Sequence, residues 1–409
     1  MNSENSKIQV NSQKPERREL LADLVFRAWA EINLDCISSN VAEIQKAVGP
    51  HTEIMAVVKA DAYGHGVMET VQTLLDAGIS RLAVSMLDEA LQLRKIGIEA
   101  PILVLGHSNP ARAEEIIAHS ITQTVYSYDI AHALSKASER IGLPANIHIK
   151  IDTGMSRIGL PAGYAAVKDI VAISRLPGIV IEGVFTHFSS ADEMSTDFTH
   201  QQFEQFESIL DELGRIGVYI PLRHASNSAG IMAHPYAHLD LVRAGIILYG
   251  ILPSSYINRP DLFFQPAMSL KAYIIHVKQI QKGAAVSYGR KWIAERDSLI
   301  ATLPVGYADG YSRHFTNCAR VLVNGQFAPI VGTVCMDQCM VDITDVQGDV
   351  HTGDEVVLIG KQGDNLITVE ELAILADTIP YEIICLIGKR IPRVYLRDGE
   401  IVHIHNYLI

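Results

Sequence analysis

The strongest constraint on the fold is a rhythm in which short apolar segments alternate with segments of helical spacing. Amphipathic stretches such as 65–78, 88–97 and 203–217 each close on a glycine, as helices often do before the chain turns back into a strand. The segments between them are rich in β-branched residues and have the length of buried strands: 53–60, 81–86, 101–106, 122–127, 146–152, 178–188, 221–226 and 239–246. Eight such units in succession predict an α/β fold, a (β/α)8 barrel of the TIM type.

The rhythm changes near Pro266, after which strand patterns alternate with turns. Residues 321–331 contain Asn324 and Gly325, a pair typical of a two-residue hairpin turn, and further strand patterns occur at 355–360 and 393–405. We therefore expect three parts: a polar N-terminal tail at 1–21, a barrel at 22–265 and a mostly β C-terminal domain at 266–409.

Charge and apolar content indicate which partners this chain takes. The formal net charge is −12, and acidic and basic residues are mixed without a basic stripe, which argues against nucleic acid or an anionic membrane as a partner and favours a small molecule. The sequence has neither an apolar run of about 20 residues nor a signal-peptide pattern at its start. We expect a cytoplasmic protein with no membrane contact.

The cysteines do not predict a metal site. There are five, scattered along the chain, which suits reduced thiols. Cys335 and Cys339 are four residues apart, but a second pair of ligands is missing, so we expect no zinc. Motifs for nucleotide binding (GxxxxGK[ST], GxGxxG) and for zinc proteases (HExxH) are likewise missing.

Reactive side chains follow the predicted strands at their carboxyl ends, where barrels of this type build active sites. The set comprises Lys59, Lys150 with Arg157 after it, His187, His224 with Asn227 and Ser228 after it, and Arg243. At the end of an apolar strand Lys59 would be partly desolvated, which lowers its pKa and makes it a nucleophile towards an aldehyde. The pattern alone leaves a second interpretation open, in which the stem of this lysine packs and its amine reaches water.

The segments after the seventh and eighth strands resemble a phosphate cradle. They read SNSAG (226–230) and RAGI (243–246), and they offer a hydroxyl, small residues and free backbone N–H groups at the usual phosphate position of such barrels. A conjugating lysine and a phosphate cradle at one barrel mouth indicate a site for pyridoxal 5'-phosphate (PLP).

Longer runs make the resemblance specific. From Arg27 to Tyr395 the chain resembles the alanine racemases, PLP enzymes of the barrel-fold class, in the runs VVKADAYGHG, IKIDTGMSRIG, FTHFSSAD, HASNSAG, VRAGIILYG, VSYGR, LPVGYADGYSR, VGTVCMDQCMVD and IPRVY. This resemblance implies interconversion of L- and D-alanine, with D-alanine supplied for peptidoglycan.

The resemblance also implies a two-base mechanism shared between subunits. Lys59 would hold PLP covalently and act as the base on one face of the substrate α-carbon, and Tyr288 from the β domain of a second subunit would act on the other face. Racemisation requires both groups, because one acid/base group exchanges a proton on one side only. A homodimer with shared active sites follows. His187 and Arg243 would help a tyrosine, whose free pKa is near 10, to act as a base at neutral pH.

Further roles come from the same resemblance. Arg243 would face the pyridine nitrogen of PLP; because arginine keeps its proton, that nitrogen would stay unprotonated and the ring would be a weaker electron sink, as suits a racemase. His224 would stack on or beside the ring and hydrogen-bond towards Arg243. Arg157 would contact the phenolic oxygen of PLP and the substrate carboxylate, positioned by Lys150, which is commonly carbamylated in this family.

The remaining assignments concern the phosphate and the substrate. The phosphate positions are matched by Tyr63, Ser228, Gly245, Ile246 and Tyr381, with Asn227 beside them. Met336 of the second subunit would donate a backbone N–H to the substrate carboxylate, and Asp337 would support Tyr288. Tyr288, Tyr307, Tyr381 and Met336 crowd the space beyond the α-carbon, which suits a methyl side chain but rejects serine poorly.

Four alternatives stay open. The first is a broad alanine/serine racemase. An amino-acid decarboxylase of the same barrel class would be expected to carry a carboxylate in place of Arg243. A non-catalytic PLP-binding protein would lack the β domain, and a Schiff-base aldolase would not need the phosphate cradle.

Overall fold

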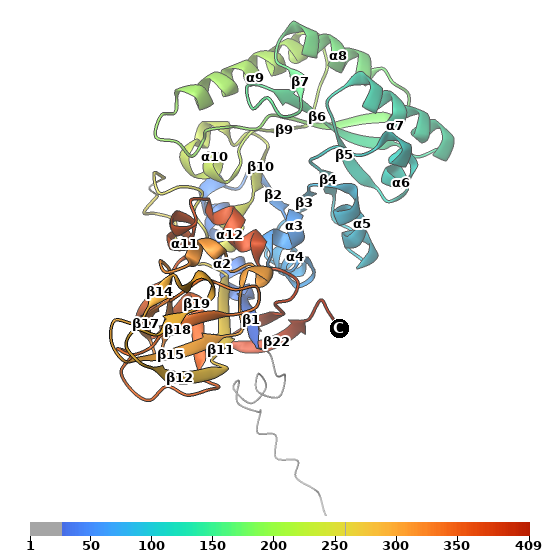
Figure 1. Cartoon of the computed structure of the whole chain (residues 1–409). Coiled ribbons are helices and arrows are strands. Elements are labelled where there is room, and N and C mark those ends of the chain that lie inside the picture. The colour runs from blue at the N-terminus through green and yellow to red at the C-terminus, as the bar shows by residue number, and fades with distance from the viewer. Residues whose placement is uncertain (1–26, 258) are drawn as a thin grey trace, which may run out of the picture.

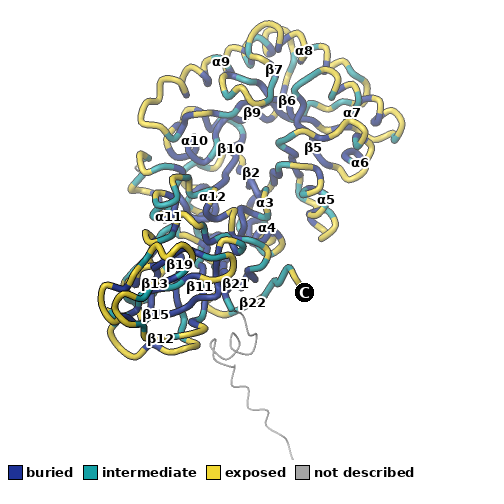
Figure 2. The backbone as a smooth tube through the Cα atoms, viewed as in Figure 1, coloured by how far each residue is buried: buried dark blue, intermediate teal, exposed yellow. Residues whose placement is uncertain are grey.

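The computed structural model describes residues 27–257 and 259–409; the expected tail at 1–21 lies outside the described residues. Two lobes are visible in Figure 1, a barrel built from the first part of the chain and a β domain built from the last part. Buried backbone concentrates in the barrel strands and in the central sheet of the β domain (Figure 2).

Eight parallel strands form the barrel, as the sequence rhythm predicts. Their order in the sheet is β10-β2-β3-β4-β5-β6-β8-β9, and the short β7 (Leu160–Pro161) pairs with β6. The strands are β2 (Glu53–Val57), β3 (Arg81–Val84), β4 (Ile102–Val104), β5 (Ile121–Val125), β6 (Ala145–Asp152), β8 (Ile179–Phe185), β9 (Leu222–His224) and β10 (Leu241–Ala244). Backbone hydrogen bonds close the ring between β9 and β10, from the Arg243 N–H to the Ser226 oxygen (3.0 Å) and from the Asp240 N–H to the Arg223 oxygen (3.2 Å).

Helices cover the outside of this ring. β4, β5 and β10 are buried along their whole length, as expected for parallel strands packed on both faces. A single turn, α3 (Lys59–Tyr63), follows β2 at the carboxyl ends of the strands. The helices of the outer layer are α4 (Val67–Asp76), α5 (Leu87–Lys95), α6 (Ala113–Ala118), α7 (Tyr128–Ile141), α8 (Tyr164–Ser174), α9 (Asp197–Arg215) and α10 (Ser228–Ala233). Local signals set their ends: Ser127 caps α7 by accepting from the Ile130 N–H, and Gly142 ends it in the left-handed region at φ 74°.

The last unit differs from the simple rhythm. β10 is followed only by a short 3-10 helix, η3 (Ile246–Tyr249), and the long helix α2 (Leu34–Val48), which precedes the first barrel strand, contacts η3, α4 and α10. The eighth position of the outer helical layer is therefore filled by α2, which precedes the first barrel strand in the sequence.

The C-terminal domain is built on an eight-stranded sheet of order β17-β16-β19-β11-β1-β21-β22, with β20 paired to β19. Residues 28–33 were expected within the barrel range 22–265, but they form β1 (Ala28–Asn33), which lies between β11 (antiparallel) and β21 (parallel) in this sheet. The other members are β11 (Met268–Tyr273), β16 (Arg320–Val323), β17 (Gln326–Pro329), β19 (Glu355–Gln362), β20 (Asn365–Ile367), β21 (Arg393–Arg397) and β22 (Glu400–His405).

Smaller elements complete this domain. One sheet joins β12 (His276–Ile280), β15 (Ser298–Leu303) and β18 (Cys339–Asp342), and another joins β13 (Ala285–Val286) and β14 (Trp292–Ile293). Two helices, α11 (Val369–Leu375) and α12 (Pro380–Leu386), lie towards the barrel (Figure 1). The predicted Asn-Gly hairpin is present: Asn324 and Gly325 have φ of 49° and 73° between β16 and β17, as a type I′ turn requires.

Candidate active site

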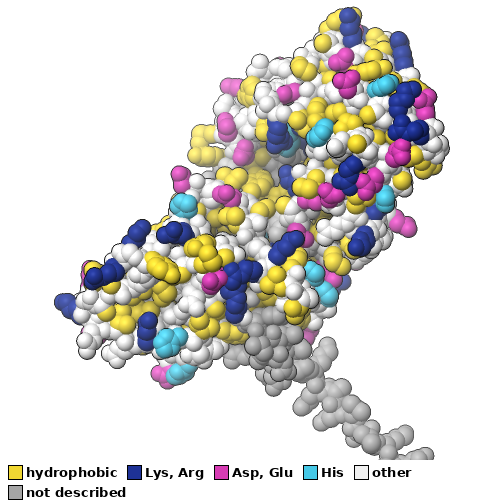
Figure 3. All heavy atoms as spheres, turned by 45° about the vertical axis from the view of Figure 1, so that its right-hand side comes forward, with side chains coloured by type: hydrophobic (Ala, Val, Ile, Leu, Met, Phe, Trp, Pro, Cys, Tyr) yellow, Lys and Arg dark blue, Asp and Glu magenta, His cyan; other side chains and the backbone are white. Residues whose placement is uncertain are grey.

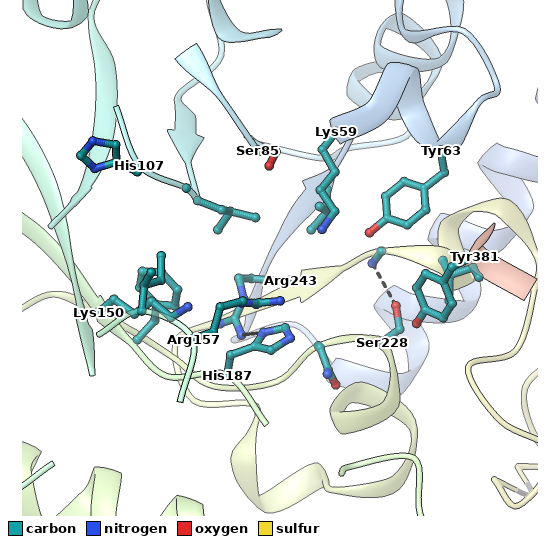
Figure 4. A pocket seen from close by; sticks show the side chains of 18 residues that line it. Lys59, Tyr63, Ser85, His107, Lys150, Arg157, His187, Ser228, Arg243 and Tyr381 are labelled. Carbon is teal, nitrogen blue, oxygen red and sulfur yellow. Dashed lines mark hydrogen bonds between the residues drawn. The ribbon is translucent and has the colours of Figure 1, made fainter. Parts of the chain in front are cut away.

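A cavity of about 420 Å³ opens at the carboxyl ends of the barrel strands, where the sequence predicts the site (Figure 4). Eleven of the nominated residues line it: Lys59, Tyr63, Lys150, Arg157, His187, Asn227, Ser228, Arg243, Gly245, Ile246 and Tyr381. Tyr381 comes from α12 of the β domain, so both domains contribute to the wall.

Lys59 follows β2 by two residues, and its side chain points into the cavity (Figure 4). Burial, and next the Arg157 cation, lower the pKa of Lys59 below its ordinary value. Such an environment increases the fraction of the lysine amine that is neutral and therefore nucleophilic. The four residues after Lys59 all have φ between 52° and 56°, a left-handed turn that contains no glycine.

On the side of the cavity formed by β9 and β10 lies a cradle of small and hydroxylated residues. The Gly245 N–H donates to the Ser228 Oγ at 3.0 Å, and the Asn227 side chain caps α10 by accepting from the Gly230 N–H at 2.9 Å. A Cβ added at Gly245 would lie 3.0 Å from the Tyr63 hydroxyl and 3.4 Å from the Ser228 Oγ, so only glycine leaves this part of the cradle open. The Tyr381 ring lies 6.1 Å from the Tyr63 ring at the same place.

Arg243 is nearly fully buried beneath the cavity and makes four hydrogen bonds. Its guanidinium donates to the Thr186 oxygen (2.9 Å), the Ala225 oxygen (2.8 Å), the His224 Nδ1 (2.9 Å) and the His187 Nδ1 (3.2 Å). Burial, and next Arg157, lower the pKa of Arg243 to about 9, still high enough for a cation at neutral pH. Burial and the Arg243 cation in turn hold the pKa of both histidines well below the usual range, so both rings are neutral.

His224 does not lie where the resemblance implied. It is fully buried and absent from the cavity wall, and its ring stacks on Phe185 at 4.7 Å between centroids. The expected hydrogen bond with Arg243 is present, but stacking on a ring held in the cavity is not compatible with this placement. His224 thus lies behind Arg243 as seen from the cavity.

Lys150 and Arg157 are two further cations in the cavity wall. The Lys150 ammonium lies 5.7 Å from the centre of the Phe185 ring, and burial with the cations of Arg157 and Arg243 lowers the pKa of Lys150 to about 8. Together with Lys59, these residues give the cavity a positive potential that suits phosphate and carboxylate groups.

Apart from Tyr381, the β-domain residues nominated from the sequence lie away from the cavity. Tyr288, Tyr307, Met336 and Asp337 do not line the cavity, and the Tyr288 side chain is 73 % exposed. Tyr307 and Met336 are adjacent through their loops, in which the Tyr307 N–H donates to the Cys335 oxygen (3.0 Å). The Asp337 carboxylate, expected to support Tyr288, instead pairs with Arg390 at 2.7 Å.

Sequence reasoning missed part of the wall. Ser85 follows β3, Leu105 and Gly106 follow β4, and Phe185 ends β8, so the strand-end rule could have found all four. Val57, His107 and Ile158 complete the set. No signal in the sequence marked His148, which lies within β6 and accepts from the His224 Nε2 at 2.8 Å behind the cavity.

The surface agrees with the mixed charge of the sequence. On the face shown in Figure 3, acidic and basic side chains are interspersed over both domains. Across the described ranges, no helix combines the length and apolar character that crossing a bilayer requires.

Comparison with known proteins connects this geometry to a family. Residues 32–253 match the family model described as "Alanine racemase, N-terminal domain", and residues 267–395 match "Alanine racemase, C-terminal domain". The chain is 48 % identical over 380 residues to an alanine racemase of Clostridium novyi, an alignment that covers 93 % of this chain and 98 % of that protein.

Solved structures of alanine racemases are also similar to this chain. The alanine racemase of Clostridium difficile 630 has a TM-score of 0.91 and 41 % identity, covering 94 % of this chain and 100 % of the other. That of Bacillus anthracis with bound L-Ala-P has a TM-score of 0.87 and 39 % identity, covering 93 % and 98 %. With both of its domains matched and nearly its whole length aligned, this chain belongs to the alanine racemase family.

Proposed function

We propose that this chain interconverts L- and D-alanine with PLP, using Lys59 of one subunit and Tyr288 of a second subunit on opposite faces of the α-carbon. The observation that carries the proposal is the cavity itself, in which a desolvated lysine, the Ser228–Gly245 cradle and a buried arginine occupy one barrel mouth. Supply of D-alanine for peptidoglycan follows from that activity, and a cytoplasmic location stays a prediction.

The residues present fit PLP. The cavity is of a size typical for small-molecule sites, and the open space at Gly245, which a methyl group would fill, suits a phosphate beside the Ser228 hydroxyl and the start of α10. Tyr63, Asn227, Ile246 and Tyr381 would surround that phosphate. PLP supplies, when bound, an aldehyde that takes up the substrate amine and a ring that withdraws electrons from the α-carbon.

The protein's own groups direct the proton. Burial and the Arg157 cation lower the pKa of Lys59, so its Nζ would release a proton more readily than an exposed lysine on the face of the α-carbon that it reaches. Tyr288 Oη would serve the other face. Arg243 can only donate, so a ring nitrogen bound against it would keep its lone pair unprotonated. Arg157 would bind the substrate carboxylate with the Met336 N–H of the second subunit.

A homodimer is part of the proposal because one chain leaves the site incomplete. Tyr288 and Met336, which the two-base mechanism needs, are 73 % and 52 % exposed and do not line the cavity of their own chain, so a second chain would have to bring them to it. Carbamylation of Lys150 is also part of the proposal. With a pKa of about 8, Lys150 has a sizeable neutral fraction at cellular pH, and only the neutral amine reacts with CO2. The carbamate would replace a cation beside Arg157 by an anion that orients Arg157.

The test is a coupled assay for D-alanine formed from L-alanine, with the visible spectrum of the purified protein. We expect racemisation and an absorbance band of lysine-bound PLP that Lys59→Ala removes. A PLP band without racemisation of alanine or serine would favour the non-catalytic PLP-binding protein or the decarboxylase. A protein that binds no PLP would contradict the proposal.

A further inference from the structure

The turn after Lys59 has an unusual backbone. Ala60, Asp61 and Ala62 have φ of 52°, 56° and 54° with ψ near 50°, and Tyr63 has φ of 53°, so four residues in a row form one turn of left-handed helix. Side chains disfavour this conformation by roughly 1–2 kcal/mol per residue, and here no member is glycine. Such a turn persists only where the surrounding structure imposes it, and such segments cluster at functional sites.

Asp61 lies at the centre of the contacts that impose it. Its Oδ1 accepts from the Val67 N–H at 2.8 Å, which caps α4, where Gly66 has no side chain to do so. Its Oδ2 accepts from the hydroxyl of Tyr407, 346 residues further along the chain. Both oxygens of one carboxylate therefore tie the turn, one to the next helix and the other to the C-terminal end of the chain.

Other groups hold the remaining polar atoms of the turn. The Ala60 N–H donates to the Glu89 Oε1 at 2.7 Å. The His65 Nδ1 lies 3.1 Å from the carbonyl oxygens of both Ala62 and Tyr63. Because carbonyls only accept, this nitrogen carries the hydrogen and donates to both.

The C-terminal hairpin of β21 and β22 closes over the same turn. The buried Arg393 donates from Nε to the Gly64 oxygen at 3.0 Å, and its guanidinium lies 5.2 Å from the centre of the Tyr407 ring. A Cβ at Gly66 would lie 1.8 Å from the Tyr395 hydroxyl, so the hairpin packs directly on the backbone here. The C-terminal end of the β domain thus contacts the segment that carries the cavity lysine.

We propose that Asp61 and Tyr407 are positioning residues, which hold the left-handed turn and thereby fix where Lys59 Nζ lies in the cavity. The proposal rests on the function proposed above for Lys59. Neither residue lines the cavity, so they act through the backbone that begins at Lys59. Proton transfer depends on placement to within about 1 Å, and a shift of that size can lower a rate by about 100-fold.

The test uses Tyr407→Phe in the full-length, PLP-loaded protein, because this change removes the hydroxyl and keeps the ring over Arg393. Tyr219→Phe, at a tyrosine 85 % exposed on the barrel, is the matched control. Val323→Ala, a buried truncation in β16, is the control for a general loss of stability. Hydrogen exchange of the peptide covering residues 59–67 is measured by mass spectrometry, together with kcat and KM.

We expect amide exchange in residues 59–67 to become at least about tenfold faster in Tyr407→Phe, the factor that corresponds to losing one hydrogen bond to a charged group. We expect kcat to fall by about 10- to 100-fold with KM little changed. Asp61→Asn should act in the same direction, and both control variants should leave exchange of this peptide and kcat at wild-type values.

Two results would overturn the proposal: wild-type exchange of residues 59–67 in Tyr407→Phe, or faster exchange with unchanged kcat. An equal loss of kcat in Val323→Ala would also overturn it, since stability alone would then explain the effect. If the wild-type protein does not racemise alanine, the proposed function fails separately. Positioning is then judged by how fast Lys59 of the apoprotein captures PLP, which Tyr407→Phe must slow for the proposal to stand.

Discussion

The Nη1 of Arg243 lies 2.9 Å from the Nδ1 of His224, behind the wall of the cavity. Arginine only donates, so His224 Nδ1 accepts, and the His224 Nε2–H donates to the His148 Nδ1 at 2.8 Å. The Arg243 cation therefore determines which ring nitrogen carries the hydrogen in His224 and, through His224, in His148.

Replacing His224 by leucine should leave a buried Arg243 N–H without an acceptor. We expect the free energy of unfolding to fall by about 1–3 kcal/mol more in His224→Leu than in His224→Asn, whose Oδ1 can take the place of Nδ1. Urea unfolding of the two variants measures the difference. Equal stabilities would show that the Arg243 hydrogen bond is not what His224 contributes.

The cradle at Gly245 gives a prediction about PLP affinity. In Gly245→Ala the added methyl would lie 3.0 Å from the Tyr63 hydroxyl and 3.4 Å from the Ser228 Oγ, in the space proposed for the phosphate. We expect PLP to bind the apoprotein about tenfold more weakly or worse, a loss of about 1.4 kcal/mol. Gly214→Ala, where a Cβ meets nothing within 4 Å, is the control and should bind as wild type does. An unchanged dissociation constant in Gly245→Ala would place the phosphate elsewhere.

The lowered pKa of Lys150 predicts how its carbamylation depends on pH. Only the neutral amine reacts with CO2; with a pKa of about 8 the reactive fraction is small at pH 6 and rises through pH 8. At fixed dissolved CO2, 13C NMR with labelled CO2 should show a carbamate signal that grows over this range and is missing in Lys150→Ala. A signal that persists in Lys150→Ala would assign the carbamate to another amine.

The same shift predicts how Lys150 contributes to stability. The folded-state pKa lies below the unfolded value, so the unfolded chain binds the proton more tightly and the unmodified Lys150 destabilises the fold below pH 8. This penalty declines as pH rises from about 8 towards the ordinary lysine value. Lys150→Met should flatten this part of the stability curve, measured by urea unfolding with CO2 excluded, and an unchanged slope would contradict the shift.

Substrate choice is tested with serine. Serine differs from alanine by one hydroxyl, and a pocket that excludes larger side chains rejects such a near-isostere by only about 10- to 100-fold. We expect kcat/KM for L-serine to fall below that for L-alanine by this factor. Undetectable serine turnover beside rapid alanine turnover would point to a specific group that excludes the hydroxyl.

Local sequence patterns predicted the barrel strands, the Asn324–Gly325 hairpin and the part of the cavity wall at the strand ends, because these features depend on neighbouring residues and on the rule that sites form at strand ends. Tyr63 and Tyr381 were predicted only by the family resemblance. Three features could not be predicted this way. Nothing in residues 60–63 favours a left-handed turn, which depends on Tyr407 at the far end of the chain. The place of β1 in the β-domain sheet could not be predicted either, because its partners β11 and β21 lie far from it in the sequence. The expected barrel range therefore included β1. The placement of His224 between Phe185 and Arg243 likewise depends on contacts with residues of other strands.

In the proposed dimer each active site combines Lys59 of one subunit with Tyr288 of the other, and mixing two kinds of inactive subunit tests this arrangement. Lys59→Ala and Tyr288→Phe should each be nearly inactive alone. After unfolding and refolding together in equal amounts, half of the dimers should be mixed, and each mixed dimer should hold one intact site, restoring about a quarter of wild-type activity. If the two groups act within one chain, every mixed dimer lacks an intact site, and activity that stays at the level of the separate variants would contradict the account.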